Sequence, residues 1–110
     1  MGAGDASDET LVASAAAFRD QAAFGELVRR HQGRIRGYLL RVSGSPAQAD
    51  DLAQETFIRA WDRLASYRGS GHFGGWLMKI AHNQFLQSLR KSARDRRLSD
   101  ALEQEAAAPE

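Results

Sequence analysis

The sequence predicts an all-α fold: a compact bundle of about four helices with disordered ends. Apolar residues recur at helical spacing through most of the chain, and no segment shows the alternation of period two that marks a strand. With 110 residues, of which 43% are hydrophobic, the chain can bury one small core. The absence of cysteine excludes disulfides and thiolate zinc sites. The helices therefore have to be held together by that single core.

The first two helices are indicated by their apolar faces. The first is expected over residues 10–19, with one face formed by Leu11, Ala15 and Phe18. The second is expected over residues 22–42, with an apolar stripe formed by Phe24, Leu27, Val28, Ile35, Tyr38, Leu39 and Val42. Asp20 between them suits a turn or an N-cap, and Gly44 suits a C-terminal stop.

The start of the third helix is the clearest local signal in the chain. Ser45 is a favoured N-cap residue, Pro46 suits the first helical position, and Gln48 would complete a capping box. This helix is expected to run to about residue 65. Its core side should hold Ala49, Leu52, Ala53, Thr56, Phe57, Ala60, Trp61 and Leu64.

A glycine-rich loop is expected before the fourth helix. Four glycines fall within residues 69–75, which weakens any helix there and places the next helix start near His72 or Phe73. The fourth helix should run over residues 73–94. Its core side should hold Phe73, Leu77, Ile80, Ala81 and Phe85.

Charge is segregated along the chain, although the net charge is only +1. Residues 46–65 hold four acids against two arginines, whereas residues 68–97 hold seven basic residues against one acid. Two neighbouring segments of opposite sign indicate two different partners.

The acidic segment carries an isoleucine on the side of the helix away from the core. This side holds Asp51, Gln54, Glu55, Ile58 and Asp62. One interpretation is a solvated face with a single stray apolar residue. The other is a docking face with Ile58 as its apolar anchor. A metal site formed by Asp51, Glu55 and the distant His82 is not favoured, because the carboxylates point outward without an evident second set of ligands.

The basic segment places an aromatic ring and an amide among its cations. One face of the fourth helix holds Trp76, Lys79, Asn83, Arg90 and Arg94. Such a face can bind phosphates, stack on bases and read base edges. The alternative is a solvated basic face with Trp76 packed into the core. Tyr67 and His72 in the loop are equally open to packing or base stacking, and no histidine or acid is arranged with a nucleophile as catalysis requires.

The residues that carry these faces also resemble a known family. Residues 50–91, with DDLAQETFIRAW and WLMKIAHN, resemble region 2 of the extracytoplasmic-function sigma factors of the sigma-70 family. Residues 22–39 are similar to the helix that precedes this region, so the resemblance covers roughly residues 11–97. Its most specific pieces are Asp51-Leu52, Gln54-Glu55, Phe57, Ala60-Trp61, Trp76-Leu77, Ile80-Ala81 and Asn83.

The resemblance implies a transcription initiation factor module, not an enzyme, with no cofactor. It implies that core RNA polymerase, through the clamp coiled coil of its beta-prime subunit, is bound by Asp51, Gln54, Glu55, Ile58 and Asp62. It also implies that the promoter −10 element, with a base flipped from the non-template strand, is bound by Tyr67, Arg68, His72, Trp76, Lys79, Asn83 and Arg90. An anti-sigma protein is a further implied partner.

The implied organisation is a disordered tail over residues 1–9, a region 2 domain over 10–97 and the start of an interdomain linker over 98–110. No apolar run approaches the roughly 20 residues that span a bilayer, and no signal peptide is evident, so we expect a cytoplasmic protein without membrane contact.

This chain departs from the family pattern in two places. Relatives often have Ser, Phe, a polar or basic residue, Thr and Trp where this chain has His72-Phe73-Gly74-Gly75-Trp76, and the two glycines loosen the expected base-capture edge. The helix-turn-helix domain that reads the −35 element is missing, which indicates either an isolated domain or a natural short form. Two other functions stay open: a decoy that binds polymerase or an anti-sigma protein without reading DNA, and a small metal-dependent helical enzyme.

Overall fold

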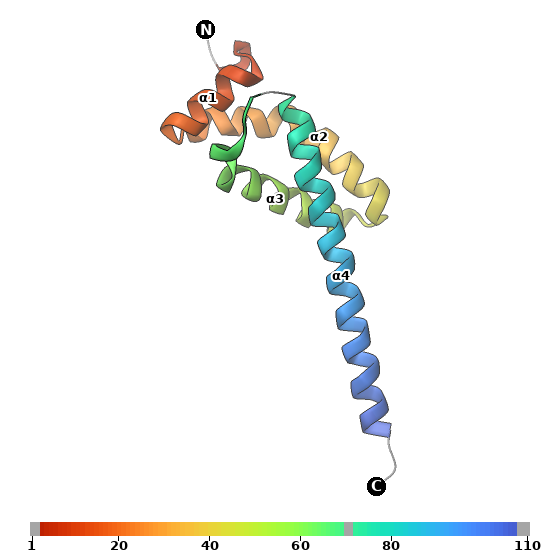
Figure 1. Cartoon of the computed structure of the whole chain (residues 1–110). Helices are drawn as coiled ribbons and strands as arrows, with labels where there is room; N and C mark the ends of the chain where they lie inside the picture. Colours follow the sequence, from red (N-terminus) through yellow and green to blue (C-terminus); the bar gives the residue numbers. More distant parts are fainter. Residues whose placement is uncertain (1–2, 70–71, 108–110) are drawn as a thin grey trace.

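The computed structural model describes residues 3–69 and 72–107, and this part of the chain is helical without any strand. The all-α prediction is therefore confirmed (Figure 1). The elements, in chain order, are η1 (Ala3–Asp5), α1 (Asp8–Phe18), α2 (Gln21–Ser43), α3 (Pro46–Asp62), η2 (Leu64–Ser66) and α4 (Phe73–Ala107), where η denotes a 3-10 turn.

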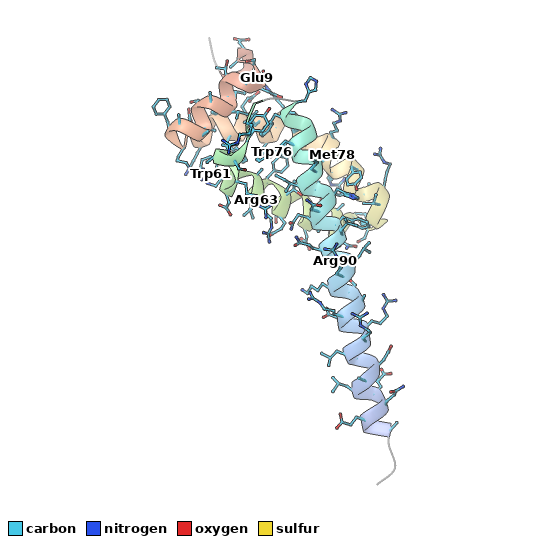
Figure 2. All side chains as sticks on the ribbon, viewed as in Figure 1. Glu9, Trp61, Arg63, Trp76, Met78 and Arg90 are labelled. Atoms are coloured by element: carbon cyan, nitrogen blue, oxygen red, sulfur yellow. The ribbon has the colours of Figure 1, made fainter. Side chains whose placement is uncertain are left out.

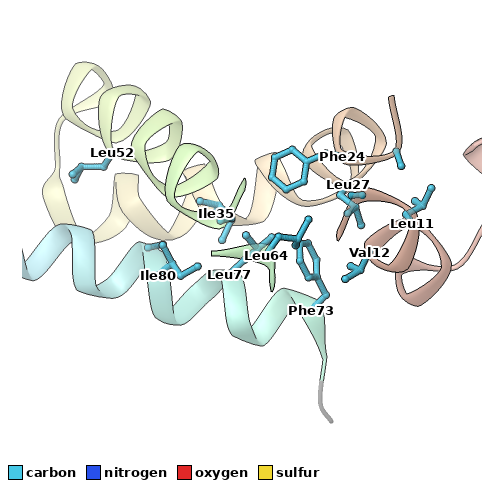
Figure 3. Close-up of a cluster of buried hydrophobic side chains, with 14 of the residues drawn as sticks. Leu11, Val12, Phe24, Leu27, Ile35, Leu52, Leu64, Phe73, Leu77 and Ile80 are labelled. Atoms are coloured by element: carbon cyan, nitrogen blue, oxygen red, sulfur yellow. The ribbon is translucent and has the colours of Figure 1, made fainter. Parts of the chain in front are cut away.

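Helix α2 is the centre of the bundle, because it packs against each of the other three α-helices. The core forms where these helices meet, with Leu27 and Leu39 of α2 and Leu77 of α4 completely buried. Figure 3 shows side chains from all four helices converging on this cluster, together with Leu64 from η2. One core of this size is what the composition predicts.

Local capping explains where α2 begins and ends. The Asp20 carboxylate accepts hydrogen bonds from the Ala23 backbone N–H at 3.2 Å and from the Ser14 hydroxyl at 2.9 Å. These hydrogen bonds lower the pKa of Asp20 from its usual value, because they favour the charged form. At the other end Gly44 adopts φ 66°, and its N–H donates to the Leu40 carbonyl at 2.9 Å. The expected roles of Asp20 and Gly44 are confirmed.

The start of α3 confirms the serine cap but not the full capping box. Ser45 Oγ accepts the Gln48 backbone N–H at 3.2 Å. The Ser45 N–H, however, donates to Ser43 Oγ at 3.2 Å, and the Gln48 amide donates to Ser88 Oγ of α4 at 3.4 Å. The expected second bond of the capping box, in which the Ser45 N–H would donate to the Gln48 side chain, is wrong. The Ser45 N–H donates to Ser43 Oγ instead, and the Gln48 side chain joins α3 to α4.

The serine cap gives a prediction about stability. Replacing Ser45 by alanine removes the acceptor for the Gln48 N–H, so we expect the free energy of unfolding to fall by about 1 kcal/mol. Ser45→Asp is the matched control, since aspartate also caps helices and should stay close to the parent. Urea unfolding followed by circular dichroism measures both variants. If both variants lost the same free energy of unfolding, Ser45 would not stabilise the chain through its N-cap hydrogen bond.

The apolar face of α1 differs from the expectation at one residue. Leu11, Val12 and Ala15 are buried, whereas Phe18 is 82% exposed. The helix ends at Phe18, and the chain turns through Arg19, which has the left-handed φ of 51°. Phe18 therefore does not share the buried face of α1, and the expectation for this residue is wrong. The Arg19 guanidinium covers the Trp61 ring at 3.6 Å from its centroid.

Both ends of the chain are more helical than expected. Helix α1 begins at Asp8, after the Ser7 N-cap, and α4 continues past the expected end at Arg94 to Ala107. The added residues are mostly strong helix formers without glycine or proline, so the helix persists although its side chains from Arg94 onward are exposed. Residues 98–107 of the expected linker are thus helical, and residues 1–2 and 108–110 of the expected disordered ends lie outside the described residues.

The extension of α4 determines the shape of the molecule. The principal extents are 73 × 24 × 22 Å, and Figure 1 shows α4 running past the other helices and continuing alone toward the C-terminus. None of the described helices is both long enough and apolar enough to cross a membrane. The surfaces that the sequence singles out lie on the bundle and on α4 as far as Arg94.

Candidate functional site

The acidic face of α3 lies outside the core, as expected. We use this name for Asp51, Gln54, Glu55, Ile58 and Asp62. Ile58 is 55% exposed, and of the four polar members only Glu55 is partly buried. The position of these residues is confirmed, whereas their role stays a prediction.

A groove of about 920 Å³ runs between α2 and α3 beside Ile58. Ile58 and Gln54 line one wall, and Phe57 and Val28 supply further apolar surface. An ion pair between Arg36 and Asp50 also belongs to the lining. A groove lined by both apolar and polar residues can receive an apolar side chain of a partner helix.

A second hollow, of about 720 Å³, lies between α3 and α4 and has mixed charge. Asp51 and Glu55 contribute carboxylates, and Arg90 lines the same hollow from α4. The Arg59 guanidinium lies 3.7 Å from Glu55, and its buried Nε has no hydrogen-bond partner among the described residues. Arg90, which is expected among the DNA-binding residues, thus lies beside the acidic face.

Three aromatic residues pack together where the loop meets α4. We call Tyr67, Phe73 and Trp76 the aromatic cluster. The Trp76 ring lies 5.3 Å from the Tyr67 ring and 5.6 Å from the Phe73 ring, measured between centroids. Burial raises the pKa of Tyr67, with a smaller contribution from the charges of Glu9 and Asp8. Trp76 is partly buried and packs against the core, as the alternative interpretation of the basic face expects.

The remaining residues expected to bind DNA are exposed. Arg68 and His72 flank the loop, whose residues 70–71 lie outside the described part, and Lys79, Asn83 and Arg90 follow along α4. Figure 2 shows Arg90 well beyond Trp76 on the same helix. The structure thus brings Lys79 and Asn83 together but separates Arg90 from them.

The start of α4 is held by contacts from α1 and α2. The His31 ring packs on Phe73 with centroids 5.4 Å apart, and its Nε2 lies 2.8 Å from Asp8 Oδ2. A Cβ on Gly74 would lie 3.4 Å from this ring, which is an ordinary contact. Of the two glycines by which this chain departs from the family pattern, Gly74 therefore lies close to His31, and Gly75 does not.

Sequence reasoning missed one pair beside Lys79 and Asn83. The Tyr38 hydroxyl of α2 and His82 Nδ1 of α4 form a hydrogen bond of 2.6 Å. The helical periodicity places Tyr38 on the apolar stripe of its helix, and the sequence suggests His82 only as a distant metal ligand. Helical spacing places each residue on its own helix but does not reveal a contact between two helices. Among the described residues, no three His, Asp or Glu side chains come together in a way that could hold a metal ion.

Comparisons with known proteins agree with the resemblance. Residues 27–95 match the family model described as Sigma-70 region 2. The chain is 44% identical over 80 residues to the ECF RNA polymerase sigma factor SigE of Mycolicibacterium smegmatis, covering 70% of this chain and 31% of that protein. It is 40% identical over 88 residues to the RNA polymerase sigma factor NccH of Alcaligenes xylosoxydans xylosoxydans, covering 79% and 46%.

A third relative is the ECF RNA polymerase sigma factor SigW of Bacillus subtilis, 36% identical over 76 residues, with coverage of 69% of this chain and 41% of that protein. The chain therefore spans less than half the length of these curated relatives. No solved structure matches the chain.

Proposed function

The chain belongs to the sigma-70 family as a region 2 protein of the extracytoplasmic-function group, and from this premise we propose that it binds core RNA polymerase and helps to recognise and melt the promoter −10 element. It acts by binding energy, without covalent chemistry. Its place of action is the cytoplasm, and an anti-sigma protein is a further partner.

The observation that carries the polymerase part of the proposal is the exposure of Ile58 beside an apolar groove. A large apolar side chain that is 55% exposed and surrounded by carboxylates has the composition of an interface anchor with a polar rim. We assign this surface to the clamp coiled coil of the beta-prime subunit. Asp51, Gln54, Glu55 and Asp62 form the rim.

The DNA part of the proposal is supported by the loop and the exposed side chains of α4. Arg68, Lys79 and Arg90 are exposed cations that can hold phosphates, and Asn83 offers a donor and an acceptor to a base edge. We assign to the same surface His72 at the loop and Tyr67 and Trp76 of the aromatic cluster. Their ligand is the non-template strand of the −10 element.

The proposal is tested with the full 110-residue chain and core RNA polymerase. Tagged chain should retain core polymerase in a pull-down, and the complex should select one motif from a random pool of single-stranded oligonucleotides. Retention of polymerase without selection of any motif would favour the decoy function. Failure to retain polymerase would overturn the proposed function.

A further inference from the structure

The start of α4 carries the two glycines by which this chain departs from the family pattern, Gly74 and Gly75. Glycine is a weak helix former, because a helix restricts its backbone more than that of any other residue. In this first turn the Trp76 backbone N–H nevertheless donates to the His72 carbonyl at 3.2 Å. Contacts with the rest of the fold are therefore needed to stabilise the turn.

The His31 side chain of α2 supplies such a contact. Its ring packs edge-on against Phe73, with centroids 5.4 Å apart and an interplanar angle of 71°. A Cβ on Gly74 would lie 3.4 Å from Nδ1 and from Cε1 of the same ring. The imidazole is mostly buried, with 15% of its side chain exposed, so its position and that of the first residues of α4 depend on each other.

Asp8 of α1 fixes the orientation of this imidazole. Its Oδ2 lies 2.8 Å from His31 Nε2, and because a carboxylate can only accept, Nε2 carries the proton and donates. The other carboxylate oxygen, Oδ1, accepts from the Arg30 guanidinium at 3.2 Å. Helix α1 is itself anchored in the core by Leu11 and Val12. The His31 ring is thus held between a fixed carboxylate and the start of α4.

Phe73 connects His31 to the surface assigned to DNA. This phenylalanine is buried, and its ring centroid lies 5.6 Å from those of both Tyr67 and Trp76. Tyr67 precedes residues 68–72 and Trp76 follows them, so the aromatic cluster joins the two flanks of the loop. A displacement of His31 would therefore be transmitted to both flanks.

We propose that Asp8 and His31 are positioning residues for DNA binding. Without touching DNA, they hold the first turn of α4 and the aromatic cluster in the conformation that binds the single strand. This inference rests on the proposed function, and the resemblance implies no such role for either residue. The pair compensates for the two glycines: a turn that is weak by itself is ordered before DNA arrives, so binding does not have to order it.

The test measures DNA affinity in the complex of the full chain with core RNA polymerase. The single-stranded oligonucleotide selected as above is fluorescently labelled and titrated at one salt concentration, with polymerase saturated by the chain. Asp8→Ala and His31→Ala should each weaken DNA binding roughly fivefold, as expected when one hydrogen bond no longer stabilises the site. The double variant should bind no more weakly than either single variant, because both substitutions remove the same contact.

Conservative variants separate the orientation of the ring from the charge of the carboxylate. Asp8→Asn keeps an oxygen that can accept from His31 Nε2, so it should bind DNA like the parent. His31→Phe keeps a ring against Phe73 but loses the donor, so its affinity should lie between those of the parent and His31→Ala. If the carboxylate acted instead by repelling phosphate, Asp8→Asn and Asp8→Ala would both bind DNA more tightly than the parent. That result would overturn the proposal.

Gln48→Ala is the matched control. The Gln48 amide donates to Ser88 Oγ at 3.4 Å, so it also joins α4 to another helix through one hydrogen bond. Ser88 lies about 18 Å beyond Trp76 along α4, at 1.5 Å per residue. Gln48→Ala should therefore keep the DNA affinity of the parent. An equal loss in Gln48→Ala and His31→Ala would indicate general loosening of the bundle and contradict a positioning role.

Hydrogen exchange of the free chain provides a readout that does not depend on DNA. The Trp76 amide should exchange faster in Asp8→Ala and His31→Ala than in the parent, because the first turn of α4 opens more often. The amide of Leu39, which lies in the core of α2, is the reference for global opening and should not change. Unchanged exchange at Trp76 would overturn the proposal even if DNA binding fell.

The outcomes also separate this inference from the function on which it rests. If the parent complex binds no oligonucleotide, the proposed function fails. If the parent binds and both alanine variants bind equally well, only the positioning role of Asp8 and His31 fails.

Discussion

Replacing Ile58 by alanine is expected to weaken binding to core RNA polymerase by about 2 kcal/mol, roughly 30-fold, because truncation of a buried interface anchor commonly costs this much. The free energy of unfolding should stay within about 0.5 kcal/mol of the parent, since the side chain is already 55% exposed in the free chain. Fluorescence titration of labelled core polymerase and urea unfolding measure the two quantities.

Leu98→Ala is the matched control for this variant. Leu98 is 61% exposed on the part of α4 that extends beyond the bundle, so its truncation removes a similar exposed apolar side chain far from the groove. It should leave polymerase binding unchanged. Glu55→Ala should also weaken binding, by less than Ile58→Ala, because rim charges contribute less than a central apolar anchor. If both Ile58→Ala and Glu55→Ala bound core RNA polymerase as tightly as the parent, the acidic face of α3 would not be the polymerase-binding surface.

The sequence predicted the elements best where the signal is local. Ser45 and Pro46 start α3 as expected, Gly44 ends α2, and the buried side of α3 contains the small and apolar residues that the helical wheel places there. Each of these features depends on residues within one or two turns of one another. The exposure of Ile58 follows from the same periodicity, because its position on the wheel opposes the core residues of its own helix.

The features that were missed depend on contacts between distant parts of the chain. Gln48 donates to Ser88 instead of closing the capping box, and the Tyr38–His82 bond joins residues 44 positions apart. Phe18, the last residue of α1, is exposed, whereas the guanidinium of the next residue, Arg19, packs on the distant Trp61. Periodicity within one helix cannot reveal which residue of another helix lies opposite. Periodicity also does not show where α4 ends, because helix propensity alone continues this helix beyond the bundle.

The position of Arg90 has a consequence for the assignment of the two surfaces. Arg90 lines the hollow between α3 and α4 together with Asp51 and Glu55, away from Lys79 and Asn83. The acidic and basic segments of the sequence therefore meet at this hollow. Within the surface assigned to DNA, contacts near Asn83 should determine base preference, whereas Arg90 should contribute only attraction for the phosphate backbone.

Asn83→Ala is expected to relax the preference of the chain at one −10 position by about 1–3 kcal/mol, whereas Lys79→Ala should weaken all single-stranded −10 oligonucleotides about equally. The two side chains are exposed neighbours on α4 and line the same hollow, so the difference tests their chemistry and not their location. An amide presents a donor and an acceptor and can distinguish base edges, while an ammonium attracts any phosphate. The measurement is a binding matrix of single-base −10 variants against the parent and both mutants.

The matrix is recorded at one fixed salt concentration, because phosphate contacts make affinity depend strongly on salt. Asn83→Asp is a useful companion to Asn83→Ala: it keeps the size of the side chain but removes the donor and adds a charge that repels phosphate. It should lose both preference and overall affinity. A uniform loss for Asn83→Ala, or a loss confined to one position for Lys79→Ala, would contradict this division of roles.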